Sequence, residues 1–155
     1  ESVVEALGEV FGCIGESTHY LGTVEGATGF KIVSNMIGMA NLSALAEGYA
    51  LCRALGVDDD GFVAALRNTG AWSAQADLRL PWMIAGDFEN RFGVDLAVKD
   101  VRLALDAAAR QGIAAQVGAA GLMNLVAASA HGFGGEDVDA VLRVVDPKTN
   151  GASGQ

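Results

Sequence analysis

Two residues four positions apart, Lys31 and Asn35, have the types and spacing needed for proton transfer at a carbonyl or hydroxyl group. Residues at i and i+4 project from one face of a helix, and a lysine among Phe30, Ile32 and Val33 is expected to be desolvated. Desolvation lowers the pKa of an amine towards the range useful for general acid and base chemistry, and the amide one turn away can position a substrate hydroxyl. The alternative is that Lys31 lies on a solvated helix end, with its stem over apolar neighbours.

A second pair, Lys99 and Asp100, falls early in a helix that Asp95 can cap. The helix dipole mildly disfavours a lysine in this place, which suggests a compensating partner or role for Lys99. Spacing alone favours Asp100 and Arg102 as ordinary surface charges.

Other catalytic or metal-binding patterns are not found in the sequence. No glycine run has the GxGxxG spacing of a nucleotide-binding loop, and His19 and His131 are far apart, so we expect no metal site. Cys13 and Cys52 lie in apolar segments without CxxC spacing, and we expect them to be reduced packing residues.

The composition predicts a folded domain that avoids polyanions. Hydrophobic residues make up 51% of the chain and charged residues 19%, and the formal net charge is −9. Nucleic acid and anionic membrane surfaces are therefore poor partners. The N-terminus has no basic region before an apolar run, so we expect no signal peptide and a cytoplasmic location. The apolar stretches 32–46 and 113–130 contain polar residues and are expected to be core helices rather than membrane spans.

The pattern of apolar residues and breakers predicts an all-α fold built round one long central helix. Residues 28–55 lack proline, are apolar on most sides and end before Gly56, which predicts a helix of about 28 residues and roughly 40 Å. Such a helix must be covered by other helices or by a partner subunit. Alternating βαβ units are not found.

Shorter elements and three regions complete the predicted organisation. A helix follows Val57, and Pro81 is expected to end or kink the helix after Ser73. A short strand and turn are expected near His19. Further helices are expected over 3–11, 96–111, 118–130 and 136–145. We assign residues 1–25 to a remnant of a preceding domain and linker, 26–146 to the helical domain, and 147–155 to a disordered tail.

The two motifs, Lys31-Ile-Val-Ser-Asn35 and Lys99-Asp-Val-Arg-Leu-Ala104, occur in order on predicted helices. Together with the break at Gly56 and the approach 86–92, they make residues 20–146 resemble the 3-hydroxyisobutyrate dehydrogenases and related β-hydroxyacid dehydrogenases. This group is similar to 6-phosphogluconate dehydrogenase. Two departures are Ser34, where the family has a first asparagine, and the glycines Gly26 and Gly29, which are offset from the usual turn.

The resemblance implies a two-domain oxidoreductase in which a preceding Rossmann domain binds NAD or NADP. Residues 1–25 would be the short N-terminal remnant of that domain, and the chain alone would be inactive. By this analogy Lys31 transfers the proton of a small β-hydroxy acid, Asn35 and Ser34 bind the substrate, and Lys99 reaches the cofactor. The long helix would supply a homodimer or higher homo-oligomer contact.

Two other functions remain open from the residues. The chain could be a non-catalytic helical oligomerisation domain whose long helix pairs with a copy of itself. It could also resemble the imine reductases, which share the architecture but commonly differ at the position of Lys31. An enzyme requires the Lys31 ammonium to face a cleft, whereas an oligomerisation domain does not.

Overall fold

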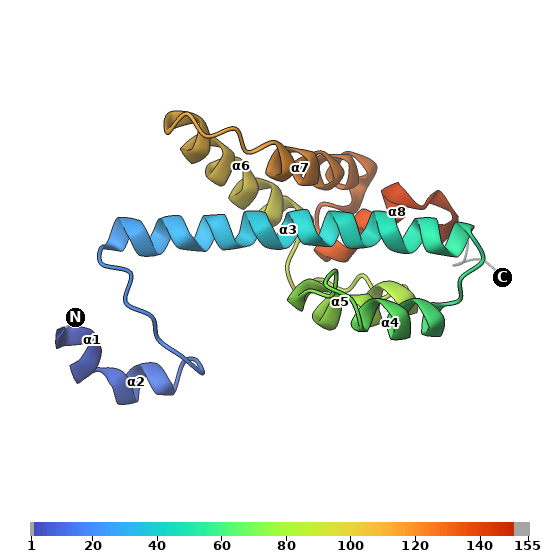
Figure 1. Cartoon of the computed structure of the whole chain (residues 1–155). Coiled ribbons are helices and arrows are strands. Elements are labelled where there is room, and N and C mark those ends of the chain that lie inside the picture. The colour runs from blue at the N-terminus through green and yellow to red at the C-terminus, as the bar shows by residue number, and fades with distance from the viewer. Residues whose placement is uncertain (1, 151–155) are drawn as a thin grey trace.

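The computed structural model describes residues 2–150, and within this range the chain is all-α, as the sequence predicted (Figure 1). An isolated β-bridge between Gly93 and Asp137 is the nearest approach to a sheet among these residues. No helix there has the length and hydropathy needed to cross a membrane. The helices are α1 Ser2–Ala6, α2 Gly8–Gly12, α3 Val24–Ala54, α4 Asp59–Arg67, α5 Ala74–Ala85, α6 Val94–Arg110, α7 Gln116–Ala128 and α8 Val141–Val145, with the π-helical turn η1 Ser129–Phe133 and the 3-10 turns η2 Val138–Ala140 and η3 Pro147–Asn150.

Helix α3 is the central element, and its 31 residues span about 46 Å. It begins four residues before the predicted start because the Thr23 side chain accepts a hydrogen bond of 3.0 Å from the Gly26 amide and caps it. Gly26 and Gly29 therefore lie inside the helix rather than in a turn. At the other end the chain leaves the helix at Gly56, whose φ of 86° suits glycine, as predicted.

The core forms where the other helices cover α3. Helices α6, α7 and α8 lie on one side of α3, and α4 and α5 lie on the other (Figure 1). Helix α7 approaches α3 closely because Gly121 has no side chain: a Cβ there would come within 3.1 Å of the Ala40 Cα. Fully buried side chains from five helices fill this core: Leu42, Tyr49, Leu80, Val101, Leu125 and Leu142.

Pro81 does not end its helix: α5 continues through Pro81, because the side chains of Leu80 and Met83 on either side of it are buried in the core. Two other local predictions are wrong. Asp95 makes no capping hydrogen bond; its Oδ1 instead accepts a hydrogen bond of 2.6 Å from the Ser129 hydroxyl. The chain before α6 is held by the β-bridge between Gly93 and Asp137. The residues around His19 form no strand.

The N-terminal helices lie outside the helical body. Helices α1 and α2 replace the single predicted helix and contain no buried residue, and in Figure 1 they stand apart from α4–α8. Cys13, expected to pack, is exposed, and Cys52 is half-buried. Of the predicted disordered tail, residues 147–150 form η3 and residues 151–155 lie outside the described range.

A buried ionic cluster joins α5 to the turn before α8. Arg79 donates to Asp137 and, at 3.3 Å, to Asp139, and both carboxylates are wholly buried. Asp137 also accepts from the backbone amides of Arg91 and Phe92 at 3.0 and 2.8 Å, so it holds the segment that leads into α6. Asp139 Oδ2 is buried without a hydrogen-bond partner. One guanidinium therefore faces two carboxylates.

Replacing Asp139 with asparagine is expected to flatten the pH dependence of stability near neutrality. Burial, reinforced by the charge of Asp137, raises the pKa of Asp139 to about 7 against the attraction of Arg79. A raised pKa means that the folded state holds this proton more tightly than the unfolded state does. The wild-type free energy of unfolding should therefore fall as pH rises from about 4 to about 7, by a few kcal/mol at most.

Urea unfolding of both proteins at several pH values between these limits would measure the effect. Asp77→Asn is the matched control, because Asp77 also faces an arginine but is exposed. An Asp139→Asn variant that loses stability with rising pH as steeply as the wild type would contradict the assignment.

Candidate active site

The carboxylate of Asp100 joins one residue of each sequence motif, Asn35 and Lys99. It lies at the crossing of α3 and α6 and is only 4% exposed. Its Oδ2 accepts a hydrogen bond of 2.7 Å from Asn35 Nδ2 on α3. Its Oδ1 pairs at 2.8 Å with the Nζ of Lys99, the preceding residue on α6. The motif that begins at Lys31 and the motif that begins at Lys99 therefore meet, although 65 residues separate Asn35 from Asp100.

The electrostatics of this site favour an ionised Asp100. Burial works against ionisation and is the largest single influence, but hydrogen bonds from Lys99 and Asn35, with the charges of Lys99 and Lys31, hold the pKa of Asp100 below its usual range. The charge of Lys31 is the smallest of these influences, whereas Lys99 pairs directly with the carboxylate.

Lys31 is exposed in this chain, so the prediction that it would be desolvated is wrong for the chain alone. The first four turns of α3 extend past the end of the core and have no helix of this chain over most of their surface (Figure 1). The side chain of Lys99 is 57% exposed. Both lysine side chains therefore reach the solvent, whereas the Asp100 carboxylate is buried.

Ser34 is not brought into this group. Its hydroxyl donates a hydrogen bond of 2.8 Å to the carbonyl of Lys31, one turn earlier on α3. A serine in a helix commonly makes this bond to its own backbone. The Ser34 hydroxyl is thus occupied locally, whereas Asn35 and Lys99 are brought together by Asp100.

Asp100 is the residue that sequence reasoning missed. The spacing favoured a surface charge, but Asp100 is buried, and Arg102 is exposed as expected. The unfavourable position of Lys99 early in a helix was the available signal, because it required a compensating anion. Beyond Lys99, the outer surface of α6 forms a groove of about 380 Å³ lined by Asp95, Lys99, Arg102 and Ser129, among others.

The arrangement can bind and protonate a small oxygen-rich molecule. A lysine ammonium can donate a proton to an alkoxide, its neutral amine can receive one from a hydroxyl, and a second ammonium can bind a carboxylate or a cofactor amide. Because Asn35 Nδ2 donates to Asp100, the Asn35 Oδ1 remains oriented as an acceptor for a hydroxyl. Within residues 2–150 no group of three His, Cys, Asp or Glu side chains could hold a metal ion.

These features define the class: an all-α helical domain with a lysine, an asparagine and a second lysine gathered where a long helix crosses its neighbour. Residues 26–145 match the family described as the NAD-binding domain of NADP-dependent 3-hydroxyisobutyrate dehydrogenase. The chain belongs to this family of β-hydroxyacid dehydrogenases and aligns with the C-terminal part of its relatives.

Curated relatives agree with this assignment. The chain is 30% identical over 137 residues to the L-threonate dehydrogenase of Cupriavidus necator, covering 88% of this chain and 46% of that protein. It is 27% identical over 150 residues to the 2-(hydroxymethyl)glutarate dehydrogenase of Eubacterium barkeri, covering 96% of this chain and 50% of that protein. The chain therefore spans about half the length of the curated relatives it matches.

Solved structures share the fold. A 3-hydroxyisobutyrate dehydrogenase from Salmonella typhimurium superimposes with a TM-score of 0.72 at 28% identity, covering 77% of this chain and 41% of that one. The Mycobacterium tuberculosis 3-hydroxyisobutyrate dehydrogenase, in a structure with L-serine, gives a TM-score of 0.82 at 22% identity, covering 94% of this chain and 52% of that one.

Proposed function

We propose that this chain is the helical substrate-binding part of an NAD- or NADP-dependent dehydrogenase that acts on a small β-hydroxy acid such as 3-hydroxyisobutyrate. The observation that carries the proposal is that Asn35 and Lys99 both bind the buried Asp100 carboxylate, with Lys31 one turn before Asn35 on α3. The names of the relatives, L-threonate dehydrogenase and 2-(hydroxymethyl)glutarate dehydrogenase, support a small hydroxy acid as the substrate class.

In the proposed reaction Lys31 is the proton-transfer residue. Its ammonium gives a proton to the carbonyl oxygen during reduction, and its neutral amine takes the proton from the hydroxyl during oxidation. Asn35, fixed by its bond to Asp100, orients the substrate hydroxyl, which donates a hydrogen bond to Asn35 Oδ1. A bound nicotinamide supplies or accepts the hydride. Asp100 positions Asn35 and Lys99 through its two hydrogen bonds.

The side chains in this chain fit the edge of a nicotinamide cofactor rather than its phosphates. The exposed ammonium of Lys99, held by Asp100, offers a donor to a carboxamide or ribose hydroxyl. The sequence has no glycine-rich phosphate loop. We therefore assign phosphate binding, and the choice between NAD and NADP, to a preceding Rossmann domain, with residues 1–25 as its last part. The chain alone should then be inactive, and we place the whole enzyme in the cytoplasm.

The exposed apolar surface of α3 supports a homodimer or higher homo-oligomer as part of the same proposal. The non-catalytic oligomerisation domain remains the second candidate, favoured by that same surface. The presence of Lys31 argues against an imine reductase.

Joining a Rossmann domain of the same family ahead of residue 1 and screening short hydroxy acids for NAD or NADP reduction would test the function. We expect turnover of a three- to five-carbon β-hydroxy acid and none by the unfused chain. A folded fusion that binds cofactor but oxidises none of these acids would exclude the proposed activity and favour the oligomerisation domain.

A further inference from the structure

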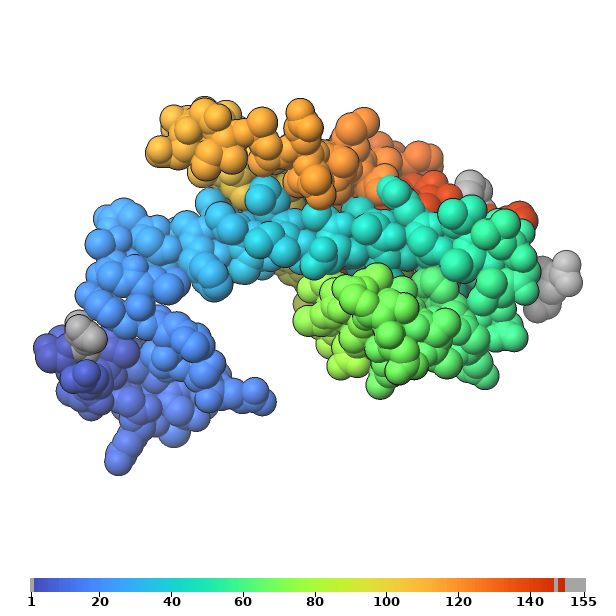
Figure 2. All heavy atoms as spheres, viewed as in Figure 1, coloured from blue at the N-terminus to red at the C-terminus, as the bar shows by residue number. Residues whose placement is uncertain are grey.

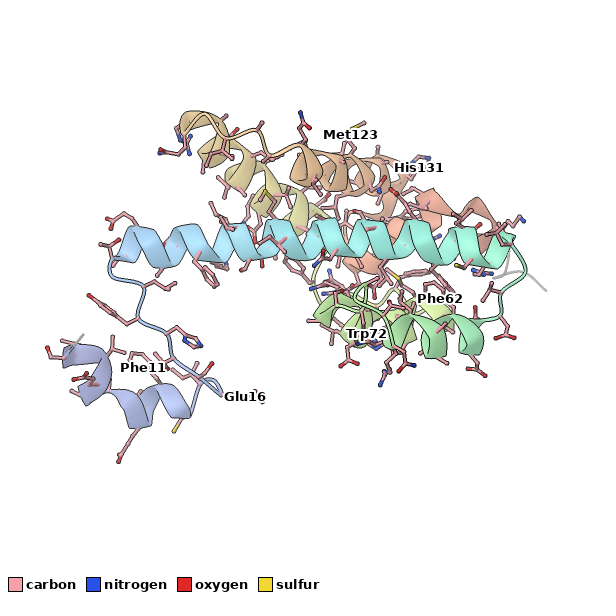
Figure 3. The ribbon with its side chains drawn as sticks, in the orientation of Figure 1. Phe11, Glu16, Phe62, Trp72, Met123 and His131 are labelled. Atoms are coloured by element: carbon pink, nitrogen blue, oxygen red, sulfur yellow. The ribbon has the colours of Figure 1, made fainter. Side chains whose placement is uncertain are left out.

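The buried ionic cluster joins the two layers of helices that cover α3. Figure 2 shows the side chains of α4 and α5 gathered on one side of α3 and those of α6 and α7 on the other. In Figure 3 Trp72 marks the first layer and His131 marks the second. Arg79 comes from α5 in the first layer, whereas Asp137 and Asp139 come from the turn that leads into α8. The cluster therefore holds the layers together through charge.

The two carboxylates of the cluster are held unequally, although both are wholly buried. Asp137 accepts hydrogen bonds from the Arg79 guanidinium and from the backbone amides of Arg91, Phe92 and Asp139. Among the described residues, Asp139 accepts from Arg79 alone, at 3.3 Å, and its Oδ2 has no partner. A buried carboxylate needs such donors to remain ionised. Asp139 is therefore the less stable anion of the two.

The charges of the cluster balance when Asp139 carries a proton. Arg79 then pairs with Asp137, and Asp139 is a neutral acid. With Asp139 ionised, the buried group would carry one uncompensated negative charge, which a protein interior tolerates poorly. The raised pKa of Asp139, about 7, agrees with this charge balance.

The segment 86–93, called the covering segment, is the part of the cluster's surroundings that can move outward. It crosses from α5 to α6 (Figure 1), and its residues 89–91 are exposed. Two amide hydrogen bonds to Asp137 Oδ2 tie it to the cluster. Helix α5 and turn η2, by contrast, are fixed by wholly buried side chains such as Leu80 and Val138. An opening that brings water to the cluster should therefore begin in the covering segment.

The other charged residues of the elements packed round Asp139 are bound elsewhere. They are Arg91 with Asp87 on the covering segment, Asp95 with Ser129 at the start of α6, and Arg143 with Glu136 at α8. The charge of Arg91 lowers the pKa of Asp139, but burial outweighs it. Asp139 is thus the group in this region whose charge is least compensated.

We propose that Asp139 is a proton-binding latch: its proton keeps the covering segment closed over the cluster, and loss of the proton to solvent releases the segment. In the closed state Asp137 binds the Arg79 guanidinium and the two amides of the segment. An ionised Asp139 competes with Asp137 for the same guanidinium and repels it. Opening to water relieves both effects, because water then solvates the second charge.

The latch lies next to the proposed active site in the chain. The covering segment leads directly into α6, which carries Lys99 and Asp100 in its second turn. Release of the segment removes hydrogen bonds that precede this helix, so the hold of Asp100 on Asn35 should weaken as pH rises. That consequence rests on the proposed function. Amide exchange does not depend on catalysis, so the failure of the latch and the failure of the dehydrogenase proposal can be told apart.

Hydrogen exchange of the Arg91 and Phe92 amides in the full chain tests the latch, because both amides bond to Asp137 in the closed state. The closed-state pKa of Asp139 is about 7, whereas the open-state pKa should return to about 4. Protection is corrected for the intrinsic pH dependence of exchange. It should then fall roughly tenfold per pH unit between about pH 4.5 and about pH 6.5 and level off above about pH 7.

Asp139→Asn replaces the acid with a neutral group of the same shape, so the protection of both amides should no longer depend on pH. Asp77→Asn on α5 is the matched control, because Asp77 is exposed, and it should keep the wild-type dependence. Wild-type protection that does not change with pH would overturn the proposal. So would an Asp139→Asn variant, folded as the wild type is, that keeps the wild-type slope.

The urea dependence of exchange separates local opening from global unfolding. Low urea should accelerate exchange at Leu125, which is wholly buried in α7, because its amide opens when the domain unfolds. Exchange at Arg91 and Phe92 should change little, because a local opening exposes little surface. Equal urea dependence at all three amides would mean that the covering segment opens only with the whole domain, and would overturn the latch.

Discussion

Replacing Lys31 with alanine is expected to reduce kcat for hydroxy-acid oxidation by roughly 10²- to 10⁴-fold in an enzyme completed by a Rossmann domain, because a positioned acid or base contributes about that much. KM should change far less, since Asn35 and Lys99 keep their contacts with Asp100. Lys31 is exposed, so its loss should not affect folding. Steady-state kinetics with the preferred acid and cofactor, alongside thermal unfolding, would measure both.

Lys148→Ala provides the control, because this lysine is also exposed but lies at the far end of the chain. Its kcat should equal that of the wild type. If Lys31→Ala retained wild-type kcat, the proton would have to come from another group, and the role of Lys31 would be wrong.

Replacing Asp100 with asparagine is expected to lower both activity and stability. The variant keeps the shape of the side chain but removes the charge that holds Lys99 and attracts Lys31. We expect a loss of about 1–3 kcal/mol in the free energy of unfolding at neutral pH, as for a buried hydrogen-bonded carboxylate. We also expect at least a tenfold loss of kcat/KM, because Asn35 and Lys99 would no longer be fixed in place.

The loss of stability should depend on pH with a definite sign. The folded-state pKa of Asp100 is lowered, so ionised Asp100 stabilises the fold above the unfolded-state pKa of about 4, and this contribution disappears as pH falls through the folded-state pKa. The difference between wild type and Asp100→Asn should therefore shrink in acid. Urea unfolding at about pH 7 and about pH 3 would show it.

Asp106→Asn on the same helix is the matched control, because Asp106 is exposed. A stability difference between wild type and Asp100→Asn that stayed constant with pH would contradict the assigned charge. Full activity in the Asp100→Asn variant would show that Asp100 is not part of the active site.

The fold was largely predictable because local signals determine it. Gly56 ends the central helix, and the caps and glycines predicted α4, α6 and α7 to within a few residues. The errors came from contacts that are distant in sequence. Pro81 is kept in a helix by burial of its neighbours, and Asp95 bonds Ser129 rather than its own helix.

The site was predictable only in part. The spacing of Lys31 and Asn35 on one helix placed them together, and family resemblance added Lys99. The burial of Asp100 could not be inferred, because its partners lie on another helix and one of them is 65 residues away. The exposure of Lys31 was missed because apolar neighbours indicate a buried surface without showing which chain covers it.

Because Gly121 has no side chain, α7 lies directly against the backbone of α3: a Cβ at Gly121 would come within 3.1 Å of the Ala40 Cα. This contact is with the backbone of Ala40, little more than one turn beyond Asn35 on α3. A methyl group at Gly121 would therefore have to displace the α3 backbone, because no flexible side chain could move aside. A larger residue at Gly121 should therefore displace α3 and change the turnover of the completed enzyme. Gly121 is thus a position where helix spacing, and not only packing, affects catalysis.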